Sequence, residues 1–596
     1  MRDFRLVNQL FRLLSILKYA VGVKRTGAIV LIYAFLGALD LVGVLAFGLI
    51  ATEIISGISP TFNAQTTNRI FEFLALENAT LQMRVGLLTA GAVLLMVIKT
   101  ISLFLVQKRI YHFLAYKSAS LSAFILREIL DRSKNNANSI STDLYTATTG
   151  VQNIYSHIVS NILTVVADLI VTSFLIIALI VIDPIIALFT IVSFALLALT
   201  LSALSGKRVR ENGRQIGILL RQSNQEVMEA ISAYREIKLR NAGMSFVSRI
   251  ARTRTLIGRY MVQQQIYPNV SKYVFESFLL VLLALVSALS LTRFDTKVTF
   301  ENLAMFLVAS SRIGPAIMRI QLSWVQAKNG VAQSEETIFE LNKYDKSEGD
   351  ILQNKGSNPV FDHDGFEPRI TIEGLSFTFL NAMNDSSDWK LELPKLEIDS
   401  GSKLYVLGES GSGKSTFADL LLGFRFPDTG SVSISDVPVF EVRERWPGAI
   451  AYVPQDIPIM HTSLVENILL GVDPMSLPLG WLEDLLEITQ LKDWVADLPS
   501  GLNTNLGEEG IIPSGGQRQR IGLARALVTK PKLILLDEST SGLDNETEFQ
   551  IFKRLDSLPW ECTEVVITHR ENLISRADIV LRVSINGEIT LVKALD

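Results

Sequence analysis

Two short segments of this 596-residue chain combine the residue types that bind and cleave a nucleoside triphosphate. The first begins at Gly408 and ends in Lys414-Ser415; its glycines let backbone N–H groups surround phosphates, its lysine can reach the β and γ phosphates, and its serine hydroxyl can ligate Mg²⁺. The second is apolar and ends in Asp537-Glu538, which places one carboxylate for Mg²⁺ and the next to polarise an attacking water. The expected contacts in the first segment are Gly408, Glu409, Ser410, Gly411, Ser412, Gly413, Lys414, Ser415 and Thr416.

These segments need particular elements to position them. Residues 402–407 read as a strand and 414–424 as a helix, so the glycine-rich turn lies between strand and helix, as a phosphate loop requires. Residues 533–536 predict a buried strand that presents both carboxylates at its end. The alternative, two charges that only cap a buried strand, is disfavoured because Lys414 lies upstream. The second half of the chain is therefore expected to be an α/β P-loop ATPase domain with ATP and Mg²⁺ as cofactors.

From about residue 370 to 589 the sequence resembles the nucleotide-binding domain of ATP-binding-cassette transporters. The positions that support the resemblance, besides those above, are Gln455, Pro513, Ser514, Gly515, Gly516, Gln517, Asp544 and His569. The resemblance implies that Ser514, Gly515 and Gly516 of one copy cover the γ-phosphate bound by a second copy. It further implies catalytic roles for Glu538, His569 and Gln455, with Gln455 also at the Mg²⁺ ion, and places Asp544 at the dimer interface. A homodimer is the expected assembly.

Two positions depart from the family pattern. Pro513 stands where the family usually has Leu, and Phe379 stands where a Tyr normally stacks on adenine. Proline is tolerated just before a helix, and phenylalanine keeps the aromatic face, so both changes are expected to have small effects. Residues 504–510 resemble the X-loop found in exporters of this family.

The first half of the chain predicts a membrane domain. The chain has a mean hydropathy of +0.32 and only 19% charged residues, and its long apolar runs all lie before about residue 325. Because a bilayer core requires about 20 apolar residues per helix, six spans are predicted. They are about 28–53, 85–106, 158–182, 185–204, 274–291 and 303–325.

Lys and Arg collect after the second and fourth spans, which places both loops, the N-terminus and the ATPase domain in the cytoplasm. The predicted architecture is a multidomain membrane protein: a six-helix exporter-type transmembrane bundle at 1–335, a linker at 336–369 and the nucleotide-binding domain at 370–596. The expected location is the plasma membrane, which is the inner membrane in bacteria, in contact with membrane lipids. No nucleic-acid partner is expected, because the spans exclude a soluble cassette protein of repair or translation.

Four cations lie inside or beside the predicted spans, where lipid disfavours them: Lys99, Lys272, Arg312 and Arg319. They suit a shared cavity for an anionic headgroup, since Arg favours phosphate. The alternative is that they pair with Asp40, Asp168 and Glu276 and only hold the bundle together. Their spacing is similar to that of exporter-type flippases for lipid-linked oligosaccharides.

The resulting prediction is an ATP-driven flippase for a polyprenyl-(pyro)phosphate-linked oligosaccharide. An exporter of other lipids, lipopolysaccharide precursors, drugs or peptides is the main alternative, and such an exporter should have a more apolar cavity. An ATP-gated channel or regulator is the second alternative, and the presence of both Glu538 and His569 disfavours it.

Overall fold

The computed structural model describes residues 22–58, 80–131, 139–182, 184–293, 296–341, 363–379, 389–507 and 510–593. The chain divides into two compact units whose boundary in the sequence lies between Asn354 and Lys355. This boundary falls inside the linker expected at 336–369.

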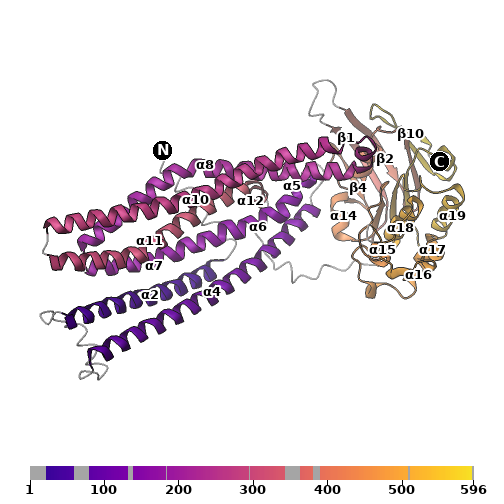
Figure 1. Cartoon of the computed structure of the whole chain (residues 1–596). Helices are drawn as coiled ribbons and strands as arrows, with labels where there is room; N and C mark the ends of the chain where they lie inside the picture. The colour runs from indigo at the N-terminus through magenta and orange to yellow at the C-terminus, as the bar shows by residue number, and fades with distance from the viewer. Residues whose placement is uncertain are drawn as a thin grey trace. The chain divides into compact units, whose positions relative to one another are not determined.

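The described residues of the first unit form helices, and the long helices run side by side in Figure 1. The long helices are α2 (Val23–Ile58), α4 (Leu81–Asp131), α7 (Ser160–Ile182), α8 (Pro184–Ser232), α10 (Gly243–Arg293) and α11 (Thr296–Gln333). The short ones are α5 (Ile140–Tyr145), α6 (Val151–Asn153), α9 (Tyr234–Leu239) and α12 (Glu335–Leu341). Helix α11 packs against both α7 and α8, and α2 packs against α4.

The expected spans fall within these long helices, apart from the first two residues of 158–182, which precede α7. Helix α11 continues through Pro315, so this proline does not end the helix that contains the expected sixth span. Among the described residues, Gln82–Asp131 and Ile140–Ile177 are long and apolar enough to cross a membrane. The number of six spans stays a prediction.

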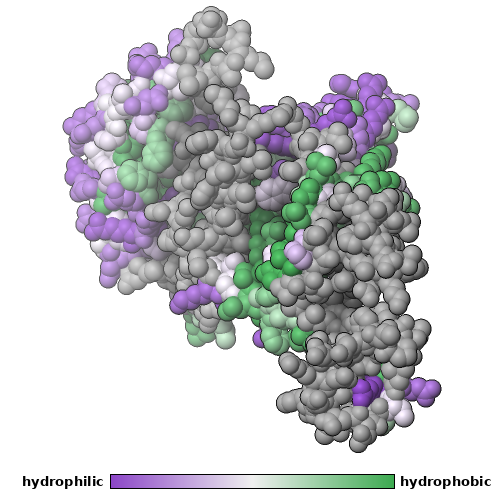
Figure 2. All heavy atoms as spheres, turned by 90° about the vertical axis from the view of Figure 1, so that its left-hand side faces the viewer, coloured by the Kyte–Doolittle hydropathy of each residue, from purple (hydrophilic) through white to green (hydrophobic). Residues whose placement is uncertain are grey.

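Large apolar side chains of this unit are exposed in the single chain, as expected for helices that lipid or other helices cover. Examples are Leu94, Phe104 and Leu280, which are more than half exposed. Figure 2 shows hydrophobic side chains gathered on one face of the molecule. Because an exposed apolar surface of this kind is unfavourable in water, it supports a membrane environment for the first unit.

A polar junction joins α5 and α6, which precede α7, to the end of α11. Two π-helical turns, Thr146–Gly150 and Ile154–Val159, lead into α7. The Tyr145 hydroxyl donates to the main-chain oxygen of Gln333 at 2.9 Å, and the Asn153 amide donates to the Gln333 side chain at 3.2 Å. The junction therefore holds the segment after the expected sixth span against the segment before the expected third span.

The described residues of the second unit form two sheets. Strands β1 (Ile370–Phe379), β2 (Trp389–Ile398), β4 (Thr429–Ile434) and β5 (Val437–Pro438) form an antiparallel sheet in the order β2-β1-β4-β5. The second sheet has the order β10-β9-β3-β8-β7-β6. Its strands are β3 (Lys403–Gly408), β6 (Ile450–Val453), β7 (Leu533–Asp537), β8 (Thr563–Ile567), β9 (Ile579–Val583) and β10 (Ile589–Lys593).

All pairings in this second sheet are parallel except that of β9 with β10. Every residue of β7 and β8 is buried, as is typical of parallel strands covered on both faces. Since the carboxyl ends of parallel strands lie at one edge, the residues after β3, β6, β7 and β8 are brought to the same edge. The predicted strands before the phosphate loop and before Asp537 are confirmed.

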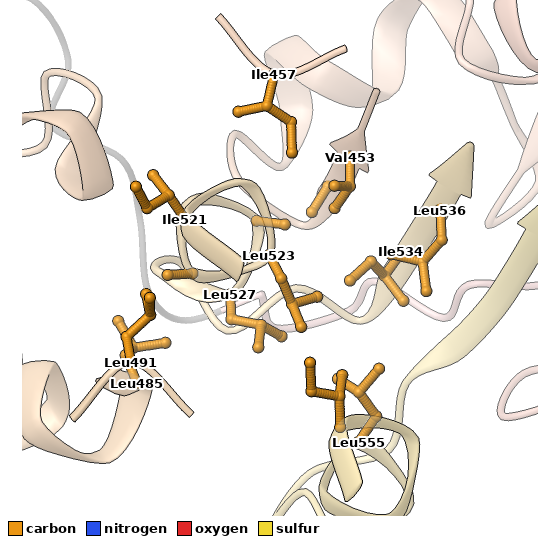
Figure 3. Close-up of a cluster of buried hydrophobic side chains, with 14 of the residues drawn as sticks. Val453, Ile457, Leu485, Leu491, Ile521, Leu523, Leu527, Ile534, Leu536 and Leu555 are labelled. Atoms are coloured by element: carbon orange, nitrogen blue, oxygen red, sulfur yellow. The ribbon is translucent and has the colours of Figure 1, made fainter. Parts of the chain in front are cut away.

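Helices cover this sheet and hold the segments at its edge. They are α13 (Lys414–Leu421), α14 (Val439–Arg445), α15 (Leu464–Leu469), α16 (Trp481–Ile488), α17 (Lys492–Ala496), α18 (Gly515–Leu527) and α19 (Asn545–Asp556). Helix α18 is anchored by Ile521, Leu523 and Leu527, which belong to the apolar cluster drawn in Figure 3. The helix predicted at 414–424 ends earlier, at Leu421, because Gly423 adopts a left-handed φ of 70°.

Candidate functional site

The phosphate loop joins β3 to α13 in the predicted way. Gly411 and Gly413 have φ values of 81° and 99°, which L-residues with side chains rarely adopt. Lys414 is buried, and its ammonium group donates to the main-chain oxygens of Gly408 at 2.9 Å and Glu409 at 2.7 Å. The lysine therefore folds back over the loop, and the N-terminus of α13 provides backbone N–H groups suited to an anion.

Asp537 ends β7 and is buried. The Tyr452 hydroxyl, on the neighbouring strand β6, donates to the Asp537 carboxylate at 3.2 Å. Burial is the largest cause that raises the pKa of Asp537, the charge of Glu538 raises it further, and hydrogen bonds from Tyr452 and Ser415 oppose the rise. The contact with Ser415 joins two of the expected Mg²⁺ ligands, and their oxygen atoms are of the type that Mg²⁺ prefers.

Two of the expected catalytic residues, Gln455 and His569, lie at the carboxylate of the third, Glu538. The Gln455 amide donates to Glu538 Oε2 at 2.9 Å, and His569 Nδ1 lies 3.7 Å from Oε1. The main chain of Glu538 has a left-handed φ of 47°, and its N–H donates to the Ile567 carbonyl at 2.9 Å. This conformation costs about 1–2 kcal/mol for a non-glycine residue, and such strain often accompanies functional sites.

The segment expected to act on a second copy forms the start of α18. Ser514 caps this helix: its hydroxyl accepts from the Gln517 N–H at 3.3 Å, and its own N–H donates to the Gln517 side chain at 2.7 Å. Nothing lies within 4 Å of a Cβ placed on Gly515. Pro513 precedes the cap, so its missing N–H removes no bond of α18.

Asp544 and the X-loop residues lie elsewhere in the second unit. Asp544 caps α19 by accepting from the Thr547 N–H at 2.9 Å and from the Thr547 hydroxyl at 2.8 Å, and these bonds lower its pKa. Gly516 of α18 lies next to Gly542 and Leu543, just before this cap. Residues 508 and 509 of the X-loop lie outside the described residues.

Phe379 is the last residue of β1, and its side chain lies outside the described part. The structure adds two aromatic residues to the site that the sequence reading missed, Tyr452 beside Asp537 and Trp389 beside the phosphate loop. Two sequence features could have indicated these residues. Tyr452 lies three residues before Gln455, and Trp389 lies at the start of a strand.

Two of the four expected cavity cations, Arg319 and Lys272, lie beside carboxylates of the first unit. Arg319 donates to both oxygens of Asp168 through Nε at 3.0 Å and Nη2 at 2.8 Å, while its side chain stays half exposed. Lys272 lies 3.8 Å from Glu276 one helical turn away. For these two cations the structure supports the alternative of pairing with carboxylates within the bundle.

The two remaining cations lie on different helices. Lys99 is half-buried on α4. Arg312 lies on α11, but its side chain, like that of Asp40, lies outside the described residues.

Comparison with known proteins agrees with the geometry of the second unit. The family model described as ABC transporter matches residues 391–541. Residues 391–541 therefore belong to an ABC transporter domain. A solved structure of a bacterial Atm1-family ABC exporter with ATP bound superposes with a TM-score of 0.73 at 20% identity, covering 95% of this chain and 94% of that one. The predicted fold class, an exporter-type helical region followed by a P-loop ATPase domain, is therefore confirmed.

Two relatives show the range of similar sequences. A multidrug resistance ABC transporter ATP-binding and permease protein of Lactococcus lactis subsp. cremoris is 35% identical over 44% of each chain. An ATP-dependent lipid A-core flippase of Thiobacillus denitrificans is 28% identical over 66% of each chain. The chain thus spans about half to two thirds of the length of these relatives.

Proposed function

We propose that this chain, which has the domain architecture of an ABC exporter, hydrolyses ATP to drive export across a membrane. The contact of Gln455 and His569 with Glu538, directly after the buried Asp537, is the observation that supports this most. Glu538 is the general base, which takes a proton from the attacking water. Gln455 orients its carboxylate through the 2.9 Å hydrogen bond, and His569 lies on the other oxygen.

ATP and Mg²⁺ fit the residues present. The loop from Gly408 to Thr416 offers backbone N–H groups and Lys414 to the phosphates, and Ser415, Gln455 and Asp537 offer oxygen ligands to the ion. When bound, Mg²⁺ neutralises charge on the transferred phosphate.

A second copy of the chain completes each site in this proposal. Ser514, Gly515 and Gly516 stand at the N-terminus of α18, a helix of 13 residues whose backbone N–H groups and positive end favour an anion. The Cβ direction of Gly515 is open, so a phosphate held by the partner copy can approach closely. The membrane units of two copies would line the export path, with multiple spans in the plasma or bacterial inner membrane and the ATPase units in the cytoplasm.

For the cargo we propose an anionic lipid-linked headgroup, of the polyprenyl-(pyro)phosphate oligosaccharide class. Arg319 pairs with Asp168, but its side chain stays half exposed, so its guanidinium can also contact an anionic cargo. The relative named as a lipid A-core flippase supports a lipid. A drug or another lipid is the second candidate, because another relative is named a multidrug resistance transporter.

The test is ATPase and flipping activity of the full chain in proteoliposomes. The arms contain a lipid-linked oligosaccharide, a lipopolysaccharide precursor, a plain phospholipid or an apolar drug. Selective stimulation and flipping of the oligosaccharide lipid support the proposed cargo, and equal stimulation by the plain phospholipid contradicts it. Absence of ATPase activity under every condition contradicts the proposed function as a whole.

Variants of the ion pair sharpen this test. Arg319→Ala leaves Asp168 without its partner in a nearly buried position, so loss of activity could come from instability. The double variant Asp168→Asn with Arg319→Gln removes both charges and leaves none unpaired. If Arg319 binds the headgroup, the double variant loses stimulation by the anionic lipid but keeps basal ATPase activity; the exposed Arg127→Ala on α4 is the control.

A further inference from the structure

Trp389 packs directly on the phosphate loop. A Cβ placed on Gly413, the residue before Lys414, would overlap the six-membered ring of Trp389. Gly413 therefore cannot take a side chain for two reasons, its φ of 99° and the indole beside it. The ring touches the loop that the proposed function assigns to the phosphates.

The orientation of this ring is fixed from the other side. The indole N–H donates to the main-chain oxygen of Ile585 at 3.1 Å, and a Cβ placed on Gly587 would lie 3.2 Å from the ring. Both residues belong to the turn between β9 and β10. Trp389 is thus held between that turn and the phosphate loop while its side chain stays only half-buried.

The pairing of β1 with β2 places a second aromatic residue opposite Trp389 in the backbone register. Trp389 is the register partner of Phe379, the residue expected at the adenine. The backbone register therefore puts two aromatic residue types opposite each other at this end of the strand pair, and the Trp389 ring of that pair lies beside Gly413.

We propose that the Trp389 indole is part of the surface that binds the nucleoside of ATP and contributes to selection for a nucleoside triphosphate over a bare phosphate chain. The phosphate loop binds the phosphates through backbone N–H groups, so the nucleoside extends beyond it onto a neighbouring surface. An aromatic ring in contact with Gly413 offers such a surface, because every base has a π-face that can stack. The proposal rests on the proposed ATP site and adds a residue to it.

A purely supporting role for Trp389 predicts a different result. If the ring only holds the shape of the phosphate loop, its removal weakens every ligand that uses the loop. If the ring contacts the nucleoside, its removal weakens ATP but not inorganic tripolyphosphate, which has no base or ribose. The two roles are therefore separable by comparing these two ligands.

The experiment measures the Kd of Mg-ATP and of inorganic tripolyphosphate for the full chain by calorimetry. Trp389→Ala is expected to raise the Kd of ATP by about 5- to 150-fold, the range found for removing one base–aromatic stack, and to change that of tripolyphosphate less than about twofold. Trp389→Phe should recover most of the affinity because it keeps an aromatic face. Trp494→Phe, on α17, is the matched control and should bind both ligands as the wild type does.

Three outcomes overturn the inference. An unchanged ATP affinity in Trp389→Ala excludes a contact with the nucleoside, and an equal loss for ATP and tripolyphosphate assigns the ring to support of the loop. A wild-type chain that binds neither ligand contradicts the proposed function itself. Because the wild type is measured first, this failure is distinguishable from the other two.

Discussion

Replacement of Glu538 by Gln tests the assignment of the general base. The substitution keeps the size of the side chain, and the amide oxygen can still accept the hydrogen bond from Gln455. The main-chain bond from residue 538 to Ile567 is also kept, and Gln tolerates the φ of 47° no worse than Glu does. The variant therefore changes the chemistry at this position with little change in local structure.

The expected loss is in turnover. A positioned general base contributes about 10²- to 10⁴-fold to the rate, which corresponds to about 3–5 kcal/mol of activation free energy. Binding of Mg-ATP should not weaken. After burial, the charge of Glu538 is among the causes that raise the pKa of Asp537, so its removal favours the ionised, metal-binding form of Asp537.

The assay combines steady-state ATPase activity with equilibrium binding of ATP to the full-length protein in detergent. Glu483→Gln, at an exposed position in the first turn of α16, is the matched control and should keep wild-type activity. Turnover of Glu538→Gln within about threefold of the wild type would refute the assignment of the base. A parallel loss of ATP affinity would instead show that Glu538 helps to hold the site together.

Two further predictions concern the support of the site. Tyr452→Phe removes a hydrogen bond that lowers the pKa of Asp537, so the carboxylate should protonate at higher pH. The acidic limb of the pH profile of Mg-ATPase activity should therefore move to higher pH. An unchanged limb, or a move to lower pH, would contradict this. Leu527→Ala creates a cavity under α18, where Leu527 is fully buried, and should lower the free energy of unfolding by about 2–5 kcal/mol in a denaturant titration. The control Leu479→Ala, at an exposed position, should change the free energy of unfolding little. Equal effects of the two substitutions would contradict the packing argument.

Much of the ATPase site could be predicted because its parts are contiguous in the chain. The phosphate loop needs glycines, a lysine and a hydroxyl within a few residues, and the carboxylate pair needs an apolar strand directly before it. The structure places both segments at the ends of β3 and β7, as expected. Helix ends were less predictable: α13 stops at Leu421 because a nearby glycine changes the backbone direction.

The pairing of cations in the membrane unit could not be predicted from the sequence. Arg319 and Asp168 are 151 residues apart, and their bond depends on how α7 packs against α11. The sequence left two interpretations open, a cavity cation or a bundle-holding pair. The structure shows the pair, because a bidentate guanidinium–carboxylate contact compensates the cost of placing both charges among apolar helices.

The amino-acid sequence alone was enough to predict a phosphate loop, a carboxylate pair and long apolar segments, because each of these needs residues that are neighbours in the chain. Which distant residues meet was set by folding instead. It brought Gln455 to Glu538 across 83 positions and Tyr452 to Asp537 across 85, and it placed Trp389 on the phosphate loop. Such contacts follow from the order of strands in the sheet and the packing of its edges, and this order is set by burial of the whole core.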